Sequence, residues 1–340
     1  MAPTVLCIST ISDAAEEWQA LSSKYTQLQF NSGTREDFLA NCRNGVYDDV
    51  VGCYRSGGST RFTGPFDAEL VAALPSSWRF IAHNGSGYDT IDVDACSRRR
   101  IAVSNTPIAV DDATADVGIF LMLGALRMAQ FSITAIRAGK WIGDTPRGHD
   151  PKGKTLGILG MGGIGRAMAY RARAFGMRII YHNRKPLDPS LAGDAEYVSF
   201  NDLLSRSDVL SLNLALNAST RHIISAAELS RTKRGVVIVN TARGAIIDEA
   251  ALVEALESGQ VSAVGLDVYE DEPRIHPGLL ANQRAFLLPH VGTFTAETSR
   301  AMELLAIRNL EAAVDEGRMF TLVAEQKGLE WVPAGKDLDA

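Results

Sequence analysis

Short apolar runs alternate along the chain with segments whose apolar residues recur at helical spacing. In the first hundred residues the runs predict four strands, at Val5–Ser9, Val50–Tyr54, Phe80–His83 and Ile101–Val103. Between them, helical spacing occurs at Ala14–Leu21 and Phe66–Leu74. Strands that alternate with helices are typical of a parallel sheet covered on both faces.

A second series of the same kind follows a long helical pattern at Ala113–Ala138, almost wholly apolar from Val117 to Leu126, which we predict to be one buried helix. Six further strands are predicted, at Thr155–Leu159, Arg178–Tyr181, Val209–Leu212, Val236–Asn240, Ala263–Asp267 and Ala285–Leu288. Helices are predicted between them, at Ile164–Phe175 and Glu249–Ser258 for example. A last helix is predicted from about Thr295 to Glu316, and the polar residues 317–340 are predicted to be a surface tail.

This order predicts an α/β protein with two Rossmann-like or flavodoxin-like domains, each a doubly wound parallel sheet. The chain has 340 residues, enough for two domains at roughly 150 residues each. Because the second series lies between the first and the final helix, we expect a discontinuous domain of residues 1–108 plus 294–340. Residues 109–293 form the inserted domain, and a ligand cleft is expected between the two.

Composition narrows the class of protein. The formal net charge is −6, and hydrophobic residues make up 46% of the chain, which is typical of a folded globular protein and not of a phosphate-tracking nucleic-acid binder. No apolar stretch is long enough for a membrane span, and the first residues lack the pattern of a secretory signal. The four cysteines form no C-x-x-C pair, so we expect buried thiols, no metal site and a cytoplasmic location.

A glycine-rich loop follows the strand predicted at 155–159 and precedes a predicted helix. It consists of Gly160, Met161, Gly162, Gly163, Ile164 and Gly165. A G-x-G-x-x-G run in this context is the signature of a dinucleotide pyrophosphate site. Gly160 permits the tight turn, Gly162 lets the backbone approach the phosphates, and the helix N-terminus supplies N–H donors.

The end of the next strand indicates which dinucleotide is preferred. Sites that prefer NAD carry Asp or Glu there, whereas this chain has Asn183, Arg184 and Lys185. A neutral amide followed by two cations attracts a 2′-phosphate. We therefore predict that NADP(H) is preferred, with NAD(H) accepted through Asn183 as the alternative.

Three charged residues follow three later predicted strands. Arg243 follows the strand at 236–240, Glu272 the next strand, and His290 the last. The carboxyl ends of parallel strands meet at one edge of a sheet, so we expect the three side chains to converge. Arginine suits a substrate carboxylate, and a histidine beside a carboxylate can transfer a proton near neutral pH.

Four sequence motifs together are highly specific to one protein family. They are the glycine loop, Asn-Thr-Ala-Arg-Gly at 240–244, Gly-Leu-Asp-Val-Tyr-Glu-Asp-Glu-Pro at 265–273 and Pro-His-Val-Gly at 289–292. In them the sequence resembles the D-isomer-specific 2-hydroxyacid dehydrogenases over roughly Val5 to Glu316. The resemblance implies that residues 1–108 plus 294–340 bind substrate and residues 109–293 bind the dinucleotide. It also implies a homodimer formed through the dinucleotide-binding domain, including the arm around Gly139–Trp141.

The same resemblance implies the site residues. His290 is the acid/base, Glu272 its partner, and Arg243 binds the carboxylate and polarises the carbonyl. The backbone N–H groups of Ser86 and Gly87 also hold the carboxylate. Further cofactor contacts are implied for Thr114, Leu214, Thr241, Ala242, Asp267 and Gly292.

The expected reaction is reduction of a small 2-keto acid to a D-2-hydroxy acid, of the glyoxylate or hydroxypyruvate type. The long loop from Tyr54 to Phe62 favours, as an alternative, an aromatic or branched 2-keto acid, as in a D-mandelate dehydrogenase. Candidate side-chain contacts for a larger substrate are Tyr54, Tyr88, Trp141 and Phe294. A non-catalytic dinucleotide-sensing protein and a formate-type oxidation remain alternatives.

Overall fold

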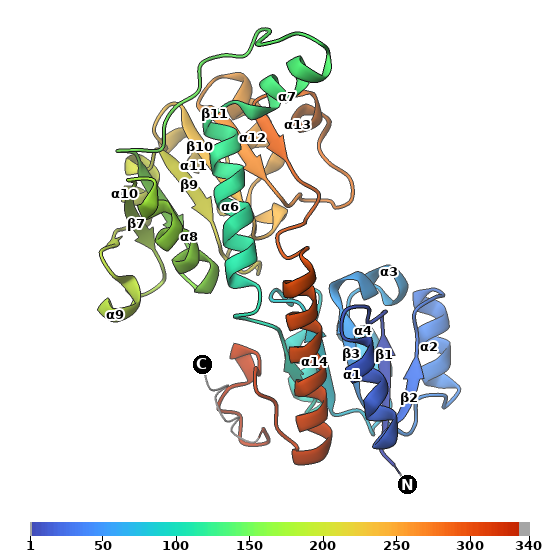
Figure 1. Ribbon diagram of the computed structural model, residues 1–340. Coiled ribbons are helices and arrows are strands. Elements are labelled where there is room, and N and C mark those ends of the chain that lie inside the picture. Colours follow the sequence, from blue (N-terminus) through green and yellow to red (C-terminus); the bar gives the residue numbers. More distant parts are fainter. Residues whose placement is uncertain (1, 333–340) are drawn as a thin grey trace. The chain divides into compact units, whose positions relative to one another are not determined.

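The computed structural model describes residues 2–332, which form two compact units (Figure 1). Unit 1 comprises the described residues up to Val110 together with those from Thr295 onward, and unit 2 comprises Asp111–Phe294. The sequence predicts divisions after residues 108 and 293, whereas the units divide after Val110 and Phe294.

Unit 1 is built on a five-stranded parallel sheet in the order β2-β1-β3-β4-β5, a flavodoxin-like arrangement. Its strands are β1 (Thr4–Ile8), β2 (Thr26–Gln29), β3 (Val50–Ser56), β4 (Phe80–Asn84) and β5 (Ala102–Ser104). Strand β2 is absent from the sequence prediction. It lies at the sheet edge with its side chains partly or fully exposed, so its residues, Thr-Gln-Leu-Gln, form no apolar run.

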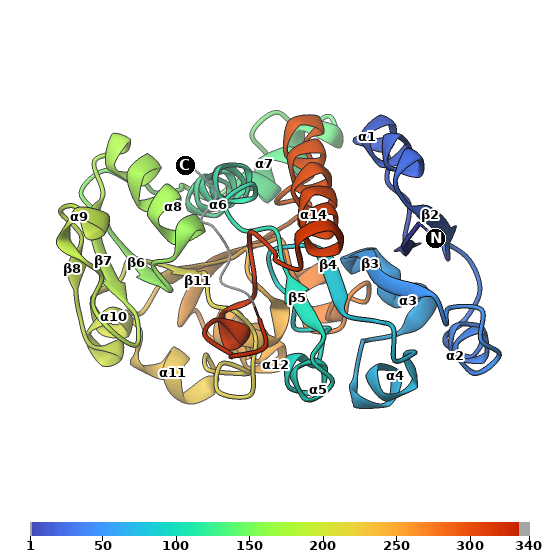
Figure 2. The same cartoon turned by 90° about the horizontal axis from the view of Figure 1, so that it is seen from below.

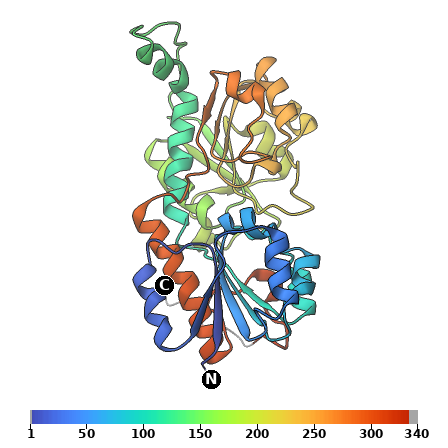
Figure 3. The same ribbon diagram turned by 90° about the vertical axis from the view of Figure 1, so that its right-hand side faces the viewer.

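Helices cover both faces of this sheet. They are α1 (Ala15–Ala20), α2 (Arg35–Arg43), α3 (Thr60–Thr63), α4 (Ala68–Ala73), α5 (Val93–Arg98) and α14 (Ala296–Glu316), with short 3-10 turns η1 (Leu21–Ser23), η2 (Gly57–Ser59) and η4 (Ala324–Gln326). Figure 3 shows α1 and the long α14 on one face, and α2, α4 and α5 on the other. Along β1 the side chains alternate accordingly: Val5 packs with Leu310 of α14, and Leu6 with Phe38 of α2.

The prediction of a surface tail after residue 316 is wrong for residues 317–326, which pack into unit 1, whereas residues 327–332 are exposed or half-buried. Met319, Val323 and Gln326 are buried in unit 1, and Leu322 pairs antiparallel with Ser104 of β5. The sequence pattern misses this burial because one of the buried residues, Gln326, is polar. Its side chain is hydrogen-bonded inside unit 1, where the amide oxygen accepts from Val103 N–H at 2.8 Å. Residues 333–340 of the predicted tail lie outside the described residues.

Unit 2 has a seven-stranded parallel sheet in the order β12-β11-β10-β9-β6-β7-β8. Its strands are β6 (Thr155–Leu159), β7 (Arg178–His182), β8 (Glu196–Tyr197), β9 (Val209–Leu212), β10 (Val236–Asn240), β11 (Val261–Leu266) and β12 (Ala285–Leu287). The predicted sheet lacked β8, which is only two exposed residues long. The strand order reverses between β6 and β9, and ligands bind at such a switch point in doubly wound sheets.

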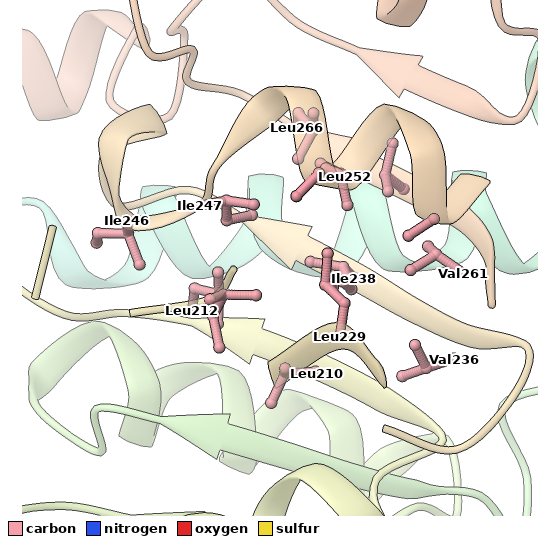
Figure 4. Close-up of a cluster of buried hydrophobic side chains, with 14 of the residues drawn as sticks. Leu210, Leu212, Leu229, Val236, Ile238, Ile246, Ile247, Leu252, Val261 and Leu266 are labelled. Carbon is pink, nitrogen blue, oxygen red and sulfur yellow. The ribbon is translucent and has the colours of Figure 1, made fainter. Parts of the chain in front are cut away.

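Helices also cover both faces of the second sheet. They are α6 (Asp111–Leu126), α7 (Ala129–Arg137), α8 (Gly163–Ala174), α9 (Pro189–Ala192), α10 (Phe200–Arg206), α11 (Ala226–Arg231), α12 (Glu249–Glu257) and α13 (Pro277–Ala281), with the 3-10 turn η3 (Gly244–Ile246). Figure 2 shows α6 and α8 on one face, and α10, α11 and α12 on the other. Against the second face, Leu252 of α12 packs on Ile238 and Leu266 (Figure 4). This core fixes the ends of β9, β10 and β11.

The single helix predicted at 113–138 is two helices. Met128 adopts a left-handed backbone with φ of +51°, which ends α6 and starts α7 at an angle of 75°. The pattern of apolar residues does not reveal this break, because apolar residues continue on both sides of it. Among the described residues no single helix is long and apolar enough to cross a membrane, and only the bent α6–α7 pair reaches that length and composition.

Candidate active site

The glycine loop joins β6 to α8 at the switch point of unit 2. Gly160 has φ of +95°, and a Cβ at Gly165 would lie 2.4 Å from the carbonyl oxygen of Gly160. Both positions therefore require glycine. By contrast, a Cβ at Gly162 would meet nothing within 4 Å. The loop is thus tightly packed at Gly160 and Gly165, while Gly162 has free space beside it at the N-terminus of the 12-residue α8. This arrangement fits a bound pyrophosphate.

Asn183, at the end of β7, is tied to this loop. Its side-chain oxygen accepts a hydrogen bond from Met161 N–H at 2.7 Å, and its backbone oxygen accepts one from the Tyr197 hydroxyl at 3.2 Å. Arg184 and Lys185 are exposed and make no ion pair with any other described residue. Two cations therefore stand beside a fixed amide next to the loop.

Asp267, after β11, organises the segment that carries His290. Its two carboxylate oxygens accept hydrogen bonds from Val291 N–H and Gly292 N–H, each at 2.8 Å. Burial raises the pKa of the Asp267 carboxyl, against the lowering effect of these two bonds. Thr114 of α6 lies against the same place, because a Cβ on Gly292 would be 3.4 Å from its methyl group.

Two further predicted cofactor residues lie at this edge of the sheet, and they differ in what they offer. The hydroxyl of Thr241 is buried and has no hydrogen-bond partner among the described residues, which fits a polar contact to a bound group. The N–H of Ala242 already donates to Asn240 at 3.0 Å, so it is not a free donor. Leu214 approaches the loop, with a methyl carbon 3.1 Å from the position of a Cβ on Gly160.

Arg243 stands in a turn that Asn240 closes. The Asn240 amide donates to the Arg243 carbonyl at 2.9 Å, while its oxygen accepts from Ala242 N–H. Gly244 then lets the turn approach the neighbouring strand end, since a Cβ there would lie 1.8 Å from the carbonyl carbon of Tyr269. Sequence reasoning missed these positioning roles. The sequence signal for such a positioning role is a polar residue, such as Asn240, at the end of a strand that is otherwise apolar and buried.

Glu272 and His290 form a hydrogen-bonded pair. His290 Nδ1 lies 2.8 Å from Glu272 Oε2, and Glu272 Oε1 accepts from Tyr269 N–H at 3.0 Å. Burial acts to raise the pKa of the Glu272 carboxyl, but these hydrogen bonds and the charges of His290 and Arg243 outweigh it and hold the pKa below its ordinary value. Glu272 is therefore ionised where it meets His290, and its carboxylate accepts the hydrogen bond from the imidazole.

The pair leaves one imidazole nitrogen for chemistry. Nδ1 faces Glu272, so Nε2 is the atom that can exchange a proton, and 47% of the His290 side chain is exposed. His290 has φ of +55°, a rare conformation for a residue with a side chain. The backbone N–H of His290 donates to the Asp267 carbonyl at 2.8 Å, which helps to hold it there.

Unit 1 carries the predicted substrate loop after β4. The N–H groups of Ser86 and Gly87 donate to no other described residue, so both remain available as a donor pair. Tyr54 is different: its ring is fully buried among core residues of unit 1, and its hydroxyl accepts from the Asn84 amide at 2.7 Å. This packing does not support the predicted direct contact of Tyr54 with substrate.

The other candidate side-chain contacts lie in different surroundings. The Tyr88 hydroxyl donates to Glu325 at 2.9 Å. Trp141 and Phe294 in unit 2 are 86% and 83% exposed.

A glycine loop at a switch point, a carboxylate–histidine pair and an arginine at adjacent strand ends define a dinucleotide-dependent oxidoreductase. Residues 119–292 match the model of the D-isomer specific 2-hydroxyacid dehydrogenase NAD binding domain. The chain belongs to the D-isomer-specific 2-hydroxyacid dehydrogenase family, whose members are NAD(P)-dependent oxidoreductases.

Individual relatives span almost the whole chain. The 4-methyl-2-oxopentanoate reductase A of Aspergillus oryzae is 62% identical over 96% of this chain and 99% of the relative. A solved structure of a glyoxylate reductase from Paecilomyes thermophila is 63% identical, with a TM-score of 0.95 over 96% of this chain and 99% of the other. The D-mandelate dehydrogenase of Rhodotorula graminis, in its holo form, is 30% identical, with a TM-score of 0.89 over 95% and 98%.

Proposed function

We propose that this protein is an NADP(H)-preferring reductase that converts small 2-keto acids of the glyoxylate and hydroxypyruvate type to D-2-hydroxy acids. The observation that carries the proposal is the 2.8 Å contact between His290 Nδ1 and Glu272 Oε2. It leaves Nε2 as a proton donor to a carbonyl oxygen, in the unit that also carries the dinucleotide loop.

In the reductive direction, a bound reduced nicotinamide dinucleotide supplies the hydride. Arg243 binds the substrate carboxylate and polarises the keto oxygen, and protonated His290 delivers its proton from Nε2 to the oxygen as negative charge develops there. Glu272, held as a carboxylate, stabilises the imidazolium before transfer. From unit 1, the Ser86 and Gly87 N–H groups supply neutral donors to the same carboxylate.

The preference for NADP(H) rests on the end of β7. A 2′-phosphate carries up to two negative charges, which exposed Arg184 and Lys185 can neutralise. Asn183, whose oxygen is held by Met161, adds no negative charge to repel it. NAD(H) is the second candidate cofactor, since the amide can also bind a ribose hydroxyl.

A branched or aromatic 2-keto acid is the second candidate substrate. The name of the Aspergillus relative specifies a branched 2-keto acid, and that of the Rhodotorula structure specifies an aromatic D-2-hydroxy acid. The glyoxylate reductase structure, at 63% identity against 62% for the Aspergillus relative, supports the smaller substrate. The site described above acts on the groups that all these substrates share, and it does not discriminate between their side chains.

We also propose a homodimer formed through unit 2, and a cytoplasmic location. Exposed apolar side chains of α7 and the arm after it support the dimer: Ile136, Trp141 and Ile142 are 53%, 86% and 69% exposed. All four cysteines are buried free thiols, which suits a reducing compartment.

Initial rates with a panel of 2-keto acids test the proposal. Glyoxylate, hydroxypyruvate, pyruvate, 4-methyl-2-oxopentanoate, phenylpyruvate and benzoylformate are compared, each with NADPH and with NADH. We expect the highest kcat/KM with NADPH and glyoxylate or hydroxypyruvate. A clear maximum at 4-methyl-2-oxopentanoate or benzoylformate selects the second substrate class. Tight cofactor binding with no turnover on any acid contradicts the enzymatic proposal and favours a dinucleotide sensor.

A further inference from the structure

The substrate loop of unit 1 is held from behind by the neighbouring strand end. Strands β4 and β5 are parallel neighbours, with Ala82 opposite Ser104, so the residues that follow them meet. The Asn105 side-chain amide donates to the Ser86 carbonyl at 2.8 Å. Thr106 N–H donates to the Gly85 carbonyl at 3.0 Å, and Gly85 N–H donates in return to the Thr106 hydroxyl at 3.0 Å.

These contacts fix the direction of the two N–H groups of the substrate loop. The Ser86 carbonyl and the Gly87 N–H belong to one planar trans peptide unit, in which they point in opposite directions. The Gly85 carbonyl and the Ser86 N–H are related in the same way. Because Asn105 and Thr106 hold the two carbonyls on one side, both N–H groups must face the other side. Hydrogen bonds to the carbonyls also polarise the peptides and strengthen the N–H donors.

Asn105 is in turn fixed by the buried C-terminal segment. The Thr321 hydroxyl donates to the Asn105 carbonyl at 2.6 Å, and Asn105 N–H donates to the Thr321 carbonyl at 3.1 Å. Thr321 is anchored to α14 through Asn309, which is fully buried, donates to its hydroxyl at 2.8 Å and accepts from its N–H at 3.1 Å. An unbroken chain of hydrogen bonds therefore runs from α14 through residues 321 and 105 to Ser86.

We propose that Asn105 is a positioning residue for the substrate carboxylate, and that the C-terminal segment around Thr321 locks it in place. Asn105 acts through the Ser86–Gly87 peptide and does not itself touch the substrate. The inference rests on the proposed function, because it requires the Ser86 and Gly87 N–H groups to bind a carboxylate. It gives the segment after α14 a part in substrate binding.

Steady-state kinetics of full-length Asn105→Ala test this role. With NADPH saturating, we expect KM to rise about tenfold for glyoxylate and by the same factor for 4-methyl-2-oxopentanoate, because the two acids share only the keto-carboxylate group. The change in kcat should stay within about threefold, and the Kd for NADPH should not change, since unit 2 is untouched. A KM change for only one acid, or none, overturns the proposal.

Variants of the C-terminal segment separate positioning from stability. Thr321→Val removes the hydroxyl donor to Asn105 and should raise KM for both acids in the same way, and Thr321→Ser should restore it. Gln326→Met is the matched control. It removes the side-chain hydrogen bonds to Val103 and Ile101, and the wild-type Gln326 side chain makes none to Asn105. It should lower Tm and leave KM unchanged. Equal KM effects in Thr321→Val and Gln326→Met would show that the segment acts through stability alone and overturn the proposal.

The failure of this inference is distinct from failure of the proposed function. A wild-type protein that reduces no 2-keto acid removes the basis of both. Normal wild-type turnover with an unchanged KM in Asn105→Ala overturns only the role of Asn105.

Discussion

A methyl group on Gly244 would lie 1.8 Å from the carbonyl carbon of Tyr269. The turn that carries Arg243 and the turn that carries Glu272 therefore touch through their backbones, without a side chain between them. This contact sets the spacing of the two charged groups. It also explains why the strand ends β10 and β11 can present them together.

Gly244→Ala should damage both stability and catalysis. The added methyl group must push the two backbones apart, which costs about 1–3 kcal/mol or more for an overpacked buried site. We expect a lower Tm and a fall in kcat/KM, because Arg243 and Glu272 move with their turns. Thermal unfolding and steady-state kinetics measure the two effects. A variant with wild-type Tm and kcat/KM would contradict the close approach.

His290→Ala should lose most turnover and keep the cofactor. Removing a general acid typically lowers kcat by about 10²–10⁴-fold. The N–H groups of Val291 and Gly292 still bind Asp267, so the segment should remain in place. Rapid-mixing kinetics with NADPH titration by fluorescence tests both statements. Normal turnover without the imidazole would exclude His290 as the proton donor.

Glu272 should contribute a pH-dependent part of the stability. Its carboxyl has a pKa below the ordinary value in the folded protein, so its contribution is present above the unfolded value of about 4.3 and is lost as pH falls through the folded value. Glu272→Gln should therefore lower Tm near neutral pH, with a difference from wild type that shrinks in acid. Calorimetry from neutral to acidic pH measures this. Glu257→Gln is the matched control, since its exposed carboxylate makes no ion pair with another described residue.

Buried strands were predictable because each is an unbroken apolar run. Strands β6, β9 and β10 match their predicted ranges or lie within a residue of them, and every one of their residues is buried. The edge strands β2 and β8 were missed because exposed side chains need not be apolar. The break at Met128 was missed for another reason: it is a backbone conformation that no side-chain pattern encodes.

Part of the site was equally predictable. Parallel topology alone places the residues after β11 and β12 at one edge, and the structure brings Glu272 and His290 into contact there. The role of Asn105 could not be read locally, because it depends on the β4–β5 register and on a segment 216 residues further along the chain. The burial of Tyr54 was likewise hidden, since a tyrosine at a strand end can face either solvent or core.

The exposed apolar arm should mediate self-association. Trp141→Glu places a charge at the most exposed large apolar side chain of that arm, and a buried unpaired charge is costly. In size-exclusion chromatography with light scattering, we expect the wild type to elute as a dimer and the variant to elute as a monomer. Tyr170→Glu is the control, because Tyr170 is a 75% exposed aromatic residue on α8. Equal masses for wild type and Trp141→Glu would rule the arm out.

Asn183→Asp should reverse the cofactor preference with little structural cost. Aspartate keeps the acceptor for Met161 N–H, so the substitution changes the charge without releasing the glycine loop. The new carboxylate repels a 2′-phosphate and can accept from a ribose 2′-hydroxyl. We expect the ratio of kcat/KM for NADPH over NADH to fall by about tenfold to a hundredfold. Asn183→Ala, which loses the acceptor, should instead weaken both cofactors, because the loop is no longer held. An unchanged ratio in Asn183→Asp would mean that the 2′-phosphate does not approach this residue.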